Sequence, residues 1–258
     1  MEHDFKVVTH SLPSTDEFIN IYPLGDVHIG SSEFNMDKFE DWIRRVRADD
    51  NGYVVIIGDL MDIATRSSKT NLWEEEMTPL QQKQYLTEML YPIRHKILGV
   101  VPGNHERRMM YDAGVNPLYD VCCKLNIEHL YHENACFIKL GVGSSKKNPD
   151  RQVQYGLALV HGATQNRHDN FCNSIDGVDV IFSGHDHKAR HVPRGKIRFN
   201  LNVGTVQFVP YQEVVVLPFQ ETGGYSLRGE YLPTCVSGTQ VIRLYSGARR
   251  VDYEYSQT

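Results

Sequence analysis

Apolar residues in the first part of the chain alternate between short runs and longer segments with helical spacing. Residues 18–24 and 53–57 are short apolar runs, each followed by Gly-Asp, and both are typical of buried parallel strands. Between them, apolar residues recur every three or four positions across 36–46, after the potential N-cap Asn35. The order strand, helix, strand predicts a βαβ unit.

Predicted strands and helices continue to alternate as far as residue 125, and the pattern then changes. Thr78-Pro79-Leu80-Gln81 has the cap, proline and Gln of a helix start, and the apolar face that follows extends to Ile93. A strand is predicted at 97–101 and a helix at 116–125. Later patterns favour strands, with a polar hairpin-type loop at 141–152. The predicted later strands are 135–140, 154–160, 178–182, 214–217 and 240–244.

These elements favour an α/β fold in which two sheets pack face to face with helices outside. No linker rich in Pro, Gly or Ser separates the motifs, so we expect a single domain over residues 1–258. Its C-terminal part is β-rich from about residue 188.

The net charge and the lack of recognisable targeting signals limit the kinds of protein that this chain is expected to be. The formal net charge of −5 argues against a protein that grips nucleic acid with its whole surface, although a local basic face stays open. The N-terminus lacks the features of a signal peptide, and no apolar run of about 18 residues is present, so we expect a cytoplasmic protein without a membrane partner. The five cysteines show no C-x-x-C spacing and are interpreted as free thiols, with Cys122 and Cys123 buried on a helix.

Candidate metal ligands follow five of the apolar runs. Each lies in a short turn beside glycine, and the five turns are Asp26-Val27-His28, Gly58-Asp59, Gly103-Asn104-His105-Glu106, His161-Gly162 and Gly184-His185-Asp186-His187. In open α/β sheets, ligands bind beyond the carboxyl ends of the strands, which is where these turns fall. Carboxylate oxygen mixed with imidazole nitrogen suits Mn²⁺, Fe or Zn²⁺ better than Mg²⁺ or Ca²⁺.

The ligand types predict two divalent metal ions, with manganese first and iron or zinc as alternatives. Asp59 is expected to bridge the ions at a separation of roughly 3.5–4 Å. One ion is assigned to Asp26, His28 and His187, and the other to Asn104, His161 and His185. Two carboxylates leave such a pair of ions with net positive charge, so an anionic phosphate ester is the expected substrate.

Other residues near these turns have expected roles in the reaction. His105 should point along the rim of the pocket and is the candidate general acid or hydrogen-bond donor. Asp62 either orients His105 or caps the following helix. Asn104 and Arg107 are candidate substrate contacts, although a solvated helix face is an alternative for Arg107.

From Asp26 to His187, the ordered motifs closely resemble those of the calcineurin-like metallophosphoesterase superfamily. The resemblance implies a four-layer α/β sandwich and a dinuclear Mn, Fe or Zn centre. It also implies hydrolysis of a phosphomonoester or phosphodiester by a metal-bridging hydroxide, with His105 as the catalytic acid. The run from Gly58 to Asp62 resembles the bacterial and phage phosphodiesterase and nuclease branches, which favours a diester.

The sequence therefore predicts an enzyme, a metal-dependent phosphoric ester hydrolase acting on a phosphodiester of nucleic acid or of a nucleotide. The alternatives are a phosphomonoesterase acting on a nucleotide or protein phosphate, and a non-catalytic interaction module on the same fold. DNA or RNA is a possible partner, because five basic residues lie between Lys188 and Arg198, although a solvated strand and turn is equally compatible with them. Substrate, native metal and oligomeric state stay open.

Overall fold

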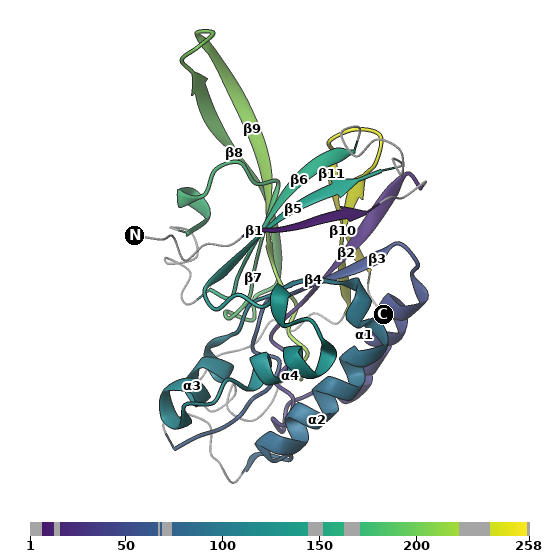
Figure 1. Cartoon of the computed structure of the whole chain (residues 1–258), viewed down its shortest axis with the longest axis vertical. Helices are drawn as coiled ribbons and strands as arrows, with labels where there is room; N and C mark the ends of the chain where they lie inside the picture. The colour runs from purple at the N-terminus through teal and green to yellow at the C-terminus, as the bar shows by residue number, and fades with distance from the viewer. Residues whose placement is uncertain are drawn as a thin grey trace.

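The computed structural model describes residues 7–12, 16–66, 68, 74–143, 152–162, 171–221 and 238–256. They form two mixed β-sheets flanked by helices (Figure 1). The six-stranded sheet has the order β1 (Val7–Leu12), β5 (Ala135–Val142), β6 (Val153–Val160), β7 (Val180–Ser183), β9 (Thr205–Val215) and β8 (Arg190–Asn200). The five-stranded sheet has the order β11 (Val251–Ser256), β10 (Thr239–Tyr245), β2 (Phe18–Leu24), β3 (Gly52–Ile56) and β4 (Ile97–Val100).

Strand β2 shows how the five-stranded sheet is buried on both faces. Ile19 and Ile21 belong to the core that also contains residues of the six-stranded sheet. Tyr22 and Leu24 belong to a second core that they share with the helices. Because side chains alternate across a strand, one apolar run supplies both cores. This confirms the prediction of an α/β fold with two sheets packed face to face.

Helices α1, α2 and α4 cover the outer face of the five-stranded sheet. Asn35 caps α1 by accepting a hydrogen bond from the backbone N–H of Lys38 at 2.8 Å, and Thr78 and Gln81 form the predicted capping box of α2. The helix predicted to extend to residue 93 ends earlier and continues as a 3-10 helix. The helical elements are α1 (Met36–Ala48), α2 (Pro79–Leu90), η2 (Tyr91–Lys96), α3 (Asn104–Ala113), α4 (Pro117–Leu125) and η3 (Glu128–Leu130).

A smaller apolar cluster covers the outer face of the six-stranded sheet. Cys172, in the short helical turn at residues 171–174, packs with Ala158, Ile181 and Tyr211. Helical segments therefore cover the outer faces of both sheets, as expected of an α/β sandwich.

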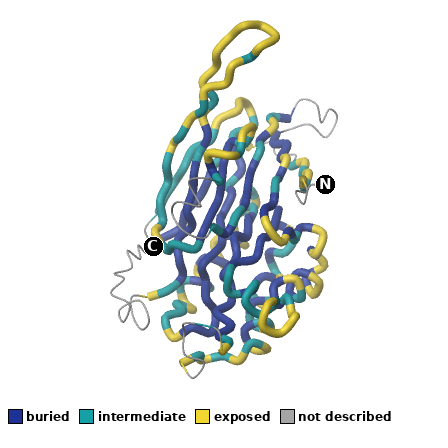
Figure 2. Tube along the Cα trace, turned by 90° about the vertical axis from the view of Figure 1, so that its left-hand side faces the viewer, coloured by how far each residue is buried: buried dark blue, intermediate teal, exposed yellow. Residues whose placement is uncertain are grey.

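The C-terminal part of the chain contributes strands to both sheets. β9 lies parallel to β7 in one sheet, and β10 lies antiparallel to β2 in the other. Sequence patterns predicted a strand at 214–217, whereas β9 ends at Val215 and begins ten residues before it, at Thr205. β8 and β9 form a long hairpin whose outer part projects from the body of the molecule (Figures 1 and 2).

The prediction for the adjacent cysteines is only half correct. Cys122 is buried and Cys123 is exposed, because neighbouring residues on α4 point about 100° apart. Cys122, Cys123 and Cys136 are free thiols. Cys235 lies outside the described residues, as do positions 144–151 of the predicted polar loop. In the part of the chain that the structure describes, no helix combines the length and apolar character needed to cross a membrane.

Candidate metal centre

All seven predicted metal ligands lie just beyond the carboxyl ends of strands. Asp26 and His28 follow β2, Asp59 follows β3, and Asn104 is the first residue of α3, just after β4. From the other sheet, His161 follows β6, and His185 and His187 follow β7. The site is therefore assembled from both sheets at one edge of the sandwich.

Most of these ligand residues have backbone conformations that are uncommon for residues other than glycine. Asp26, His28, Asp59, His185 and His187 all have positive φ, between 49° and 79°. The surrounding backbone holds the first turns in place, because the N–H groups of Asp26 and Val27 donate to the carbonyl groups of residues 58 and 59 at 3.0 and 2.8 Å. Strained backbone of this kind concentrates at functional sites, which supports a binding role for these turns.

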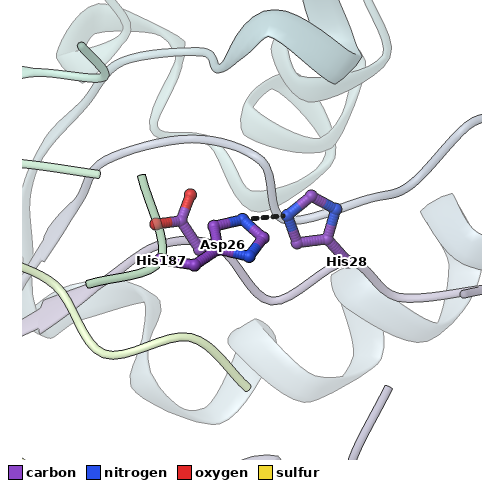
Figure 3. Close-up of side chains that lie close together, drawn as sticks. All are labelled: Asp26, His28 and His187. Carbon is purple, nitrogen blue, oxygen red and sulfur yellow. Dashed lines mark hydrogen bonds between the residues drawn. The ribbon is translucent and has the colours of Figure 1, made fainter. Parts of the chain in front are cut away.

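The first group of ligands consists of Asp26, His28 and His187 (Figure 3). Each offers an atom that lies within 4.8 Å of the others. The Nε2 atoms of His28 and His187 face each other at 3.1 Å. The other ring nitrogen of His28, Nδ1, lies 3.0 Å from the carboxylate of Asp62.

The second group consists of Asp59, His161 and His185, with Asn104 beside them. Nε2 of His161 lies 3.0 Å from Oδ2 of Asp59 and 3.1 Å from Oδ1 of Asn104. The same amide oxygen lies 2.6 Å from Nδ1 of His185. Asp59 also forms a close group with His28 and His105, so it lies between the two sets of ligands, as the predicted bridging role requires.

The predicted ligands suit metal ions, because the hydrogen bonds that they make leave lone pairs of several ligand atoms pointing toward one another. Nδ1 of His161 donates to the carbonyl of Ile57 at 2.7 Å, so Nε2 is the nitrogen left to face the acceptor oxygens of Asp59 and Asn104. Such buried acceptors need a proton or a cation between them. Burial opposes protonation of His161, but the carboxylate of Asp59 outweighs it and raises the pKa of His161 to about 9. A metal ion would replace that proton.

His187 favours the binding of a cation because its pKa is low. Burial, followed by the charge of nearby His28, lowers the pKa of His187 to about 3. A neutral imidazole keeps the lone pair that a metal needs. The carboxylates, imidazoles and amide of the two groups suit Mn²⁺, Fe or Zn²⁺.

His105 and Asp62 lie beside the first group. Nδ1 of His105 lies 2.6 Å from the main-chain carbonyl of Asp62 and 3.2 Å from its carboxylate. The same carboxylate contacts His28, and the rings of His28 and His105 meet edge to face with centroids 4.6 Å apart. Residues 63–66, directly after Asp62, are not helical. The geometry therefore favours an orienting role for Asp62 over the helix-capping alternative.

Comparison with known proteins identifies the family. A family model described as calcineurin-like phosphoesterase matches residues 19–189. The chain belongs to this family. It is also similar to the DNA polymerase II small subunit of Thermoplasma acidophilum, with 24% identity over 150 residues. That match covers 55% of this chain and 29% of the archaeal protein, so this chain corresponds to less than a third of its relative's length.

Glu106 is a residue whose structural role the sequence analysis missed. Glu106 is completely buried. Its carboxylate accepts hydrogen bonds of 2.8–3.2 Å from four backbone N–H groups, those of Asp59, Leu60, Met61 and Gly103. Glu106 thereby fastens the Asp59 turn to the start of α3. Its position three residues after Gly103, where a capping-box carboxylate is expected, was the available signal.

Gly103 allows these two turns to touch. A Cβ atom on Gly103 would lie only 2.0 Å from Oδ1 of Asp59. Any larger residue would therefore push the carboxylate of Asp59 away from the other predicted ligands.

Arg107 points toward a protein carbonyl in this structure. Its Nη2 atom donates to the carbonyl of Glu133 at 2.6 Å. The neighbouring Arg108 is close enough to the site for its charge to oppose the protonation of His105. The assignment of Arg107 and Asn104 as substrate contacts stays a prediction.

The basic residues after the last ligand motif make contacts within the protein. Arg190 pairs with Asp186 at 2.6 Å, and Arg194 pairs with the buried carboxylate of Glu213. The ammonium group of Lys196 donates to backbone carbonyls of residues 172, 173 and 175, at the end of a short helical turn. Arg190, Arg194 and Lys196 therefore have partners within the protein.

Proposed function

We propose that this chain is a phosphodiesterase that requires two divalent ions, with manganese the first candidate, and that acts on nucleic acid or a nucleotide. The observation that carries the proposal is the convergence of seven predicted ligands from both sheets into two adjoining groups. The candidate acid, His105, lies against the first group and contacts Asp59 of the second through its backbone N–H at 2.8 Å.

The charge of the site favours a phosphate ester. Asp26 and Asp59 are the only carboxylates among the seven predicted ligands, and the others are neutral when they bind a metal. Two divalent ions held here would leave net positive charge and would position the attacking and leaving oxygens of a phosphoryl group. Asp26 and Asp59 would hold these ions, and Asp59 would be shared between them.

His105 has the position and protonation expected of a general acid. Burial lowers its pKa, but the charge of Asp59 and the hydrogen bond to Asp62 outweigh burial and raise that pKa to about 9. Because Nδ1 is held by Asp62, Nε2 is the nitrogen that can serve a substrate. His105 would donate a proton from Nε2 to the leaving oxygen.

The proposed substrate class follows from the similarity to the archaeal protein. The archaeal relative is named as a subunit of a DNA polymerase, which makes nucleic acid a reasonable first substrate to test. The basic residues after His187 do not add to that support, because the pairs of Arg190 and Arg194 are internal. A nucleotide diester or a phosphomonoester is therefore the second candidate.

The complete ligand set argues against a non-catalytic interaction module. Loss of catalysis removes the requirement to keep ligands and acid together, whereas here all of them converge. A turnover panel with Mn²⁺ tests the proposal by comparing mono- and bis-p-nitrophenyl phosphate, 2′,3′- and 3′,5′-cyclic nucleotides, dinucleotide polyphosphates, and single- and double-stranded DNA. Faster hydrolysis of diesters supports it, and activity confined to monoesters contradicts it.

A further inference from the structure

The outer part of the β8–β9 hairpin exposes an apolar surface that the proposed function does not use. Figure 2 shows this projecting tip in yellow, as a run of exposed residues. The exposed side chains, 59–81% accessible, are Ile197, Phe199, Leu201, Val203, Val206 and Phe208. We call this set the hairpin patch.

The pairing of β8 with β9 places four members of the hairpin patch on one face. Ile197 lies opposite Phe208, and Phe199 lies opposite Val206. Directly opposed residues of an antiparallel pair project to the same side, so the four side chains form one continuous apolar square. The ring of Phe208 lies over Gly195, where any Cβ atom would collide with it, and this fixes the ring against the strand.

The other face of the hairpin is already in contact with the body of the protein. Lys196 donates to carbonyls of residues 172 and 173 at 3.1 and 3.0 Å, and Arg198 pairs with Asp176 at 2.6 Å. β7 pairs with β9 only at residues 212–215, so farther out the hairpin has two strands. A two-stranded ribbon with an uncovered apolar face is marginally stable in water, which indicates that a partner covers it.

We propose that the hairpin patch binds the same patch on a second copy of this chain, forming a two-fold symmetric dimer. The four side chains of the square expose on the order of 500 Å², so a symmetric contact between two copies would bury about 1,000 Å² in total, the area that a specific protein interface needs to reach. No member of the patch is charged, so two copies that each carry a formal net charge of −5 bring no like charges together at this contact.

The arrangement of side chains on the square is self-complementary. The two phenyl rings of Phe199 and Phe208 occupy one diagonal, and Ile197 and Val206 occupy the other. A two-fold axis in the plane of this face, along the strands or across them, places each phenyl ring opposite an aliphatic side chain of the second copy. Large groups therefore meet smaller ones, as an isologous interface requires.

Sedimentation velocity of the full chain from about 1 to about 100 µM tests the dimer, because this range brackets micromolar association. The wild-type protein is expected to reach twice the monomer mass. The double variant Phe199→Glu, Phe208→Glu should weaken association by at least about 100-fold, because it places charge at the centre of the contact. The uncharged variant Phe208→Ser should weaken it less and serves as a second test.

The matched control is Gln207→Glu, which adds a charge at the same distance along the hairpin but on its opposite face. It should associate like the wild type. At a concentration at which the wild type is monomeric, all variants should keep wild-type thermal unfolding. The proposal is overturned by a wild-type monomer over the whole range, by a double variant that still dimerises, or by a Gln207→Glu variant as weak as the double variant. Flotation of monomeric protein with phosphatidylcholine vesicles, lost in the double variant, would assign the patch to a lipid surface instead.

Discussion

Nε2 of His161 lies 3.0 Å from Oδ2 of Asp59, and this contact joins the ends of the two sheets. His161 follows β6 of the six-stranded sheet, and Asp59 follows β3 of the five-stranded sheet. Both side chains are buried. The proposed metal centre therefore depends on how the sheets pack, and Asp59 lies between the two groups of ligands.

Asp59→Asn should reduce the binding of both ions together. The substitution keeps one oxygen but removes the negative charge, so we expect manganese bound per chain to fall and turnover to drop by at least about 100-fold. Metal analysis of the reconstituted variant, with Asp37→Asn on the exposed first turn of α1 as the control, measures this. Normal metal content with wild-type turnover would show that Asp59 does not bridge.

His105→Ala should separate proton donation from metal binding. We expect near-normal metal content and a loss of roughly 10²–10⁴-fold in turnover for diesters with poor leaving groups. Hydrolysis of p-nitrophenyl esters should fall less, because p-nitrophenolate leaves without a proton. His129→Ala, at an exposed position, is the control. An equal loss on both kinds of substrate would indicate phosphate binding or positioning.

Glu106→Gln should destabilise the fold around the site. The amide replaces one of two acceptor oxygens that receive buried N–H groups, with an expected cost of roughly 1–3 kcal/mol. For a chain of this size, the melting temperature should fall by several degrees. Exposed Glu88 on α2 provides the control Glu88→Gln, measured by the same thermal scan. An unchanged melting temperature would contradict the fastening role assigned to Glu106.

Arg194→Ser should affect stability more than catalysis. Glu213 is completely buried, and removing its Arg194 partner is expected to cost about 1–3 kcal/mol, discounted because the arginine itself is partly exposed. Denaturant unfolding should detect this loss. Cleavage of DNA and of bis-p-nitrophenyl phosphate by the folded variant should change in parallel. A selective loss of DNA cleavage, with unaltered stability, would restore the interpretation of this segment as a nucleic-acid contact.

The sequence predicts which turns come together because the candidate ligands are local to strand ends. Asp26 and Asp59 follow β-branched or apolar runs that are recognisable without tertiary information. Parallel strands bring their carboxyl ends to one edge, which explains why distant motifs such as His161 and His187 converge. The metal and catalytic roles of these residues stay predictions until ions and turnover are measured.

The features that the sequence does not predict depend on contacts between residues far apart in the chain. Neighbouring strands β2 and β10 are more than 200 residues apart, and local patterns do not select that partner. The four N–H groups that donate to Glu106 come from two separate turns. Its position in the capping box of α3 therefore predicts only the contact with Gly103. The alternation at Ile197 and Phe199 indicates a strand, but it does not show that the apolar face lacks a covering element.

The most direct test of the proposed phosphodiesterase combines metal analysis with turnover on the same samples. Protein stripped with a strong chelator and then reconstituted with Mn²⁺ should bind about two ions per chain, as a dinuclear site requires. Hydrolysis of bis-p-nitrophenyl phosphate should be absent in the stripped sample and should return in proportion to the bound manganese. Full hydrolysis by metal-free protein, or manganese binding without any hydrolysis of the substrate panel, would contradict the account.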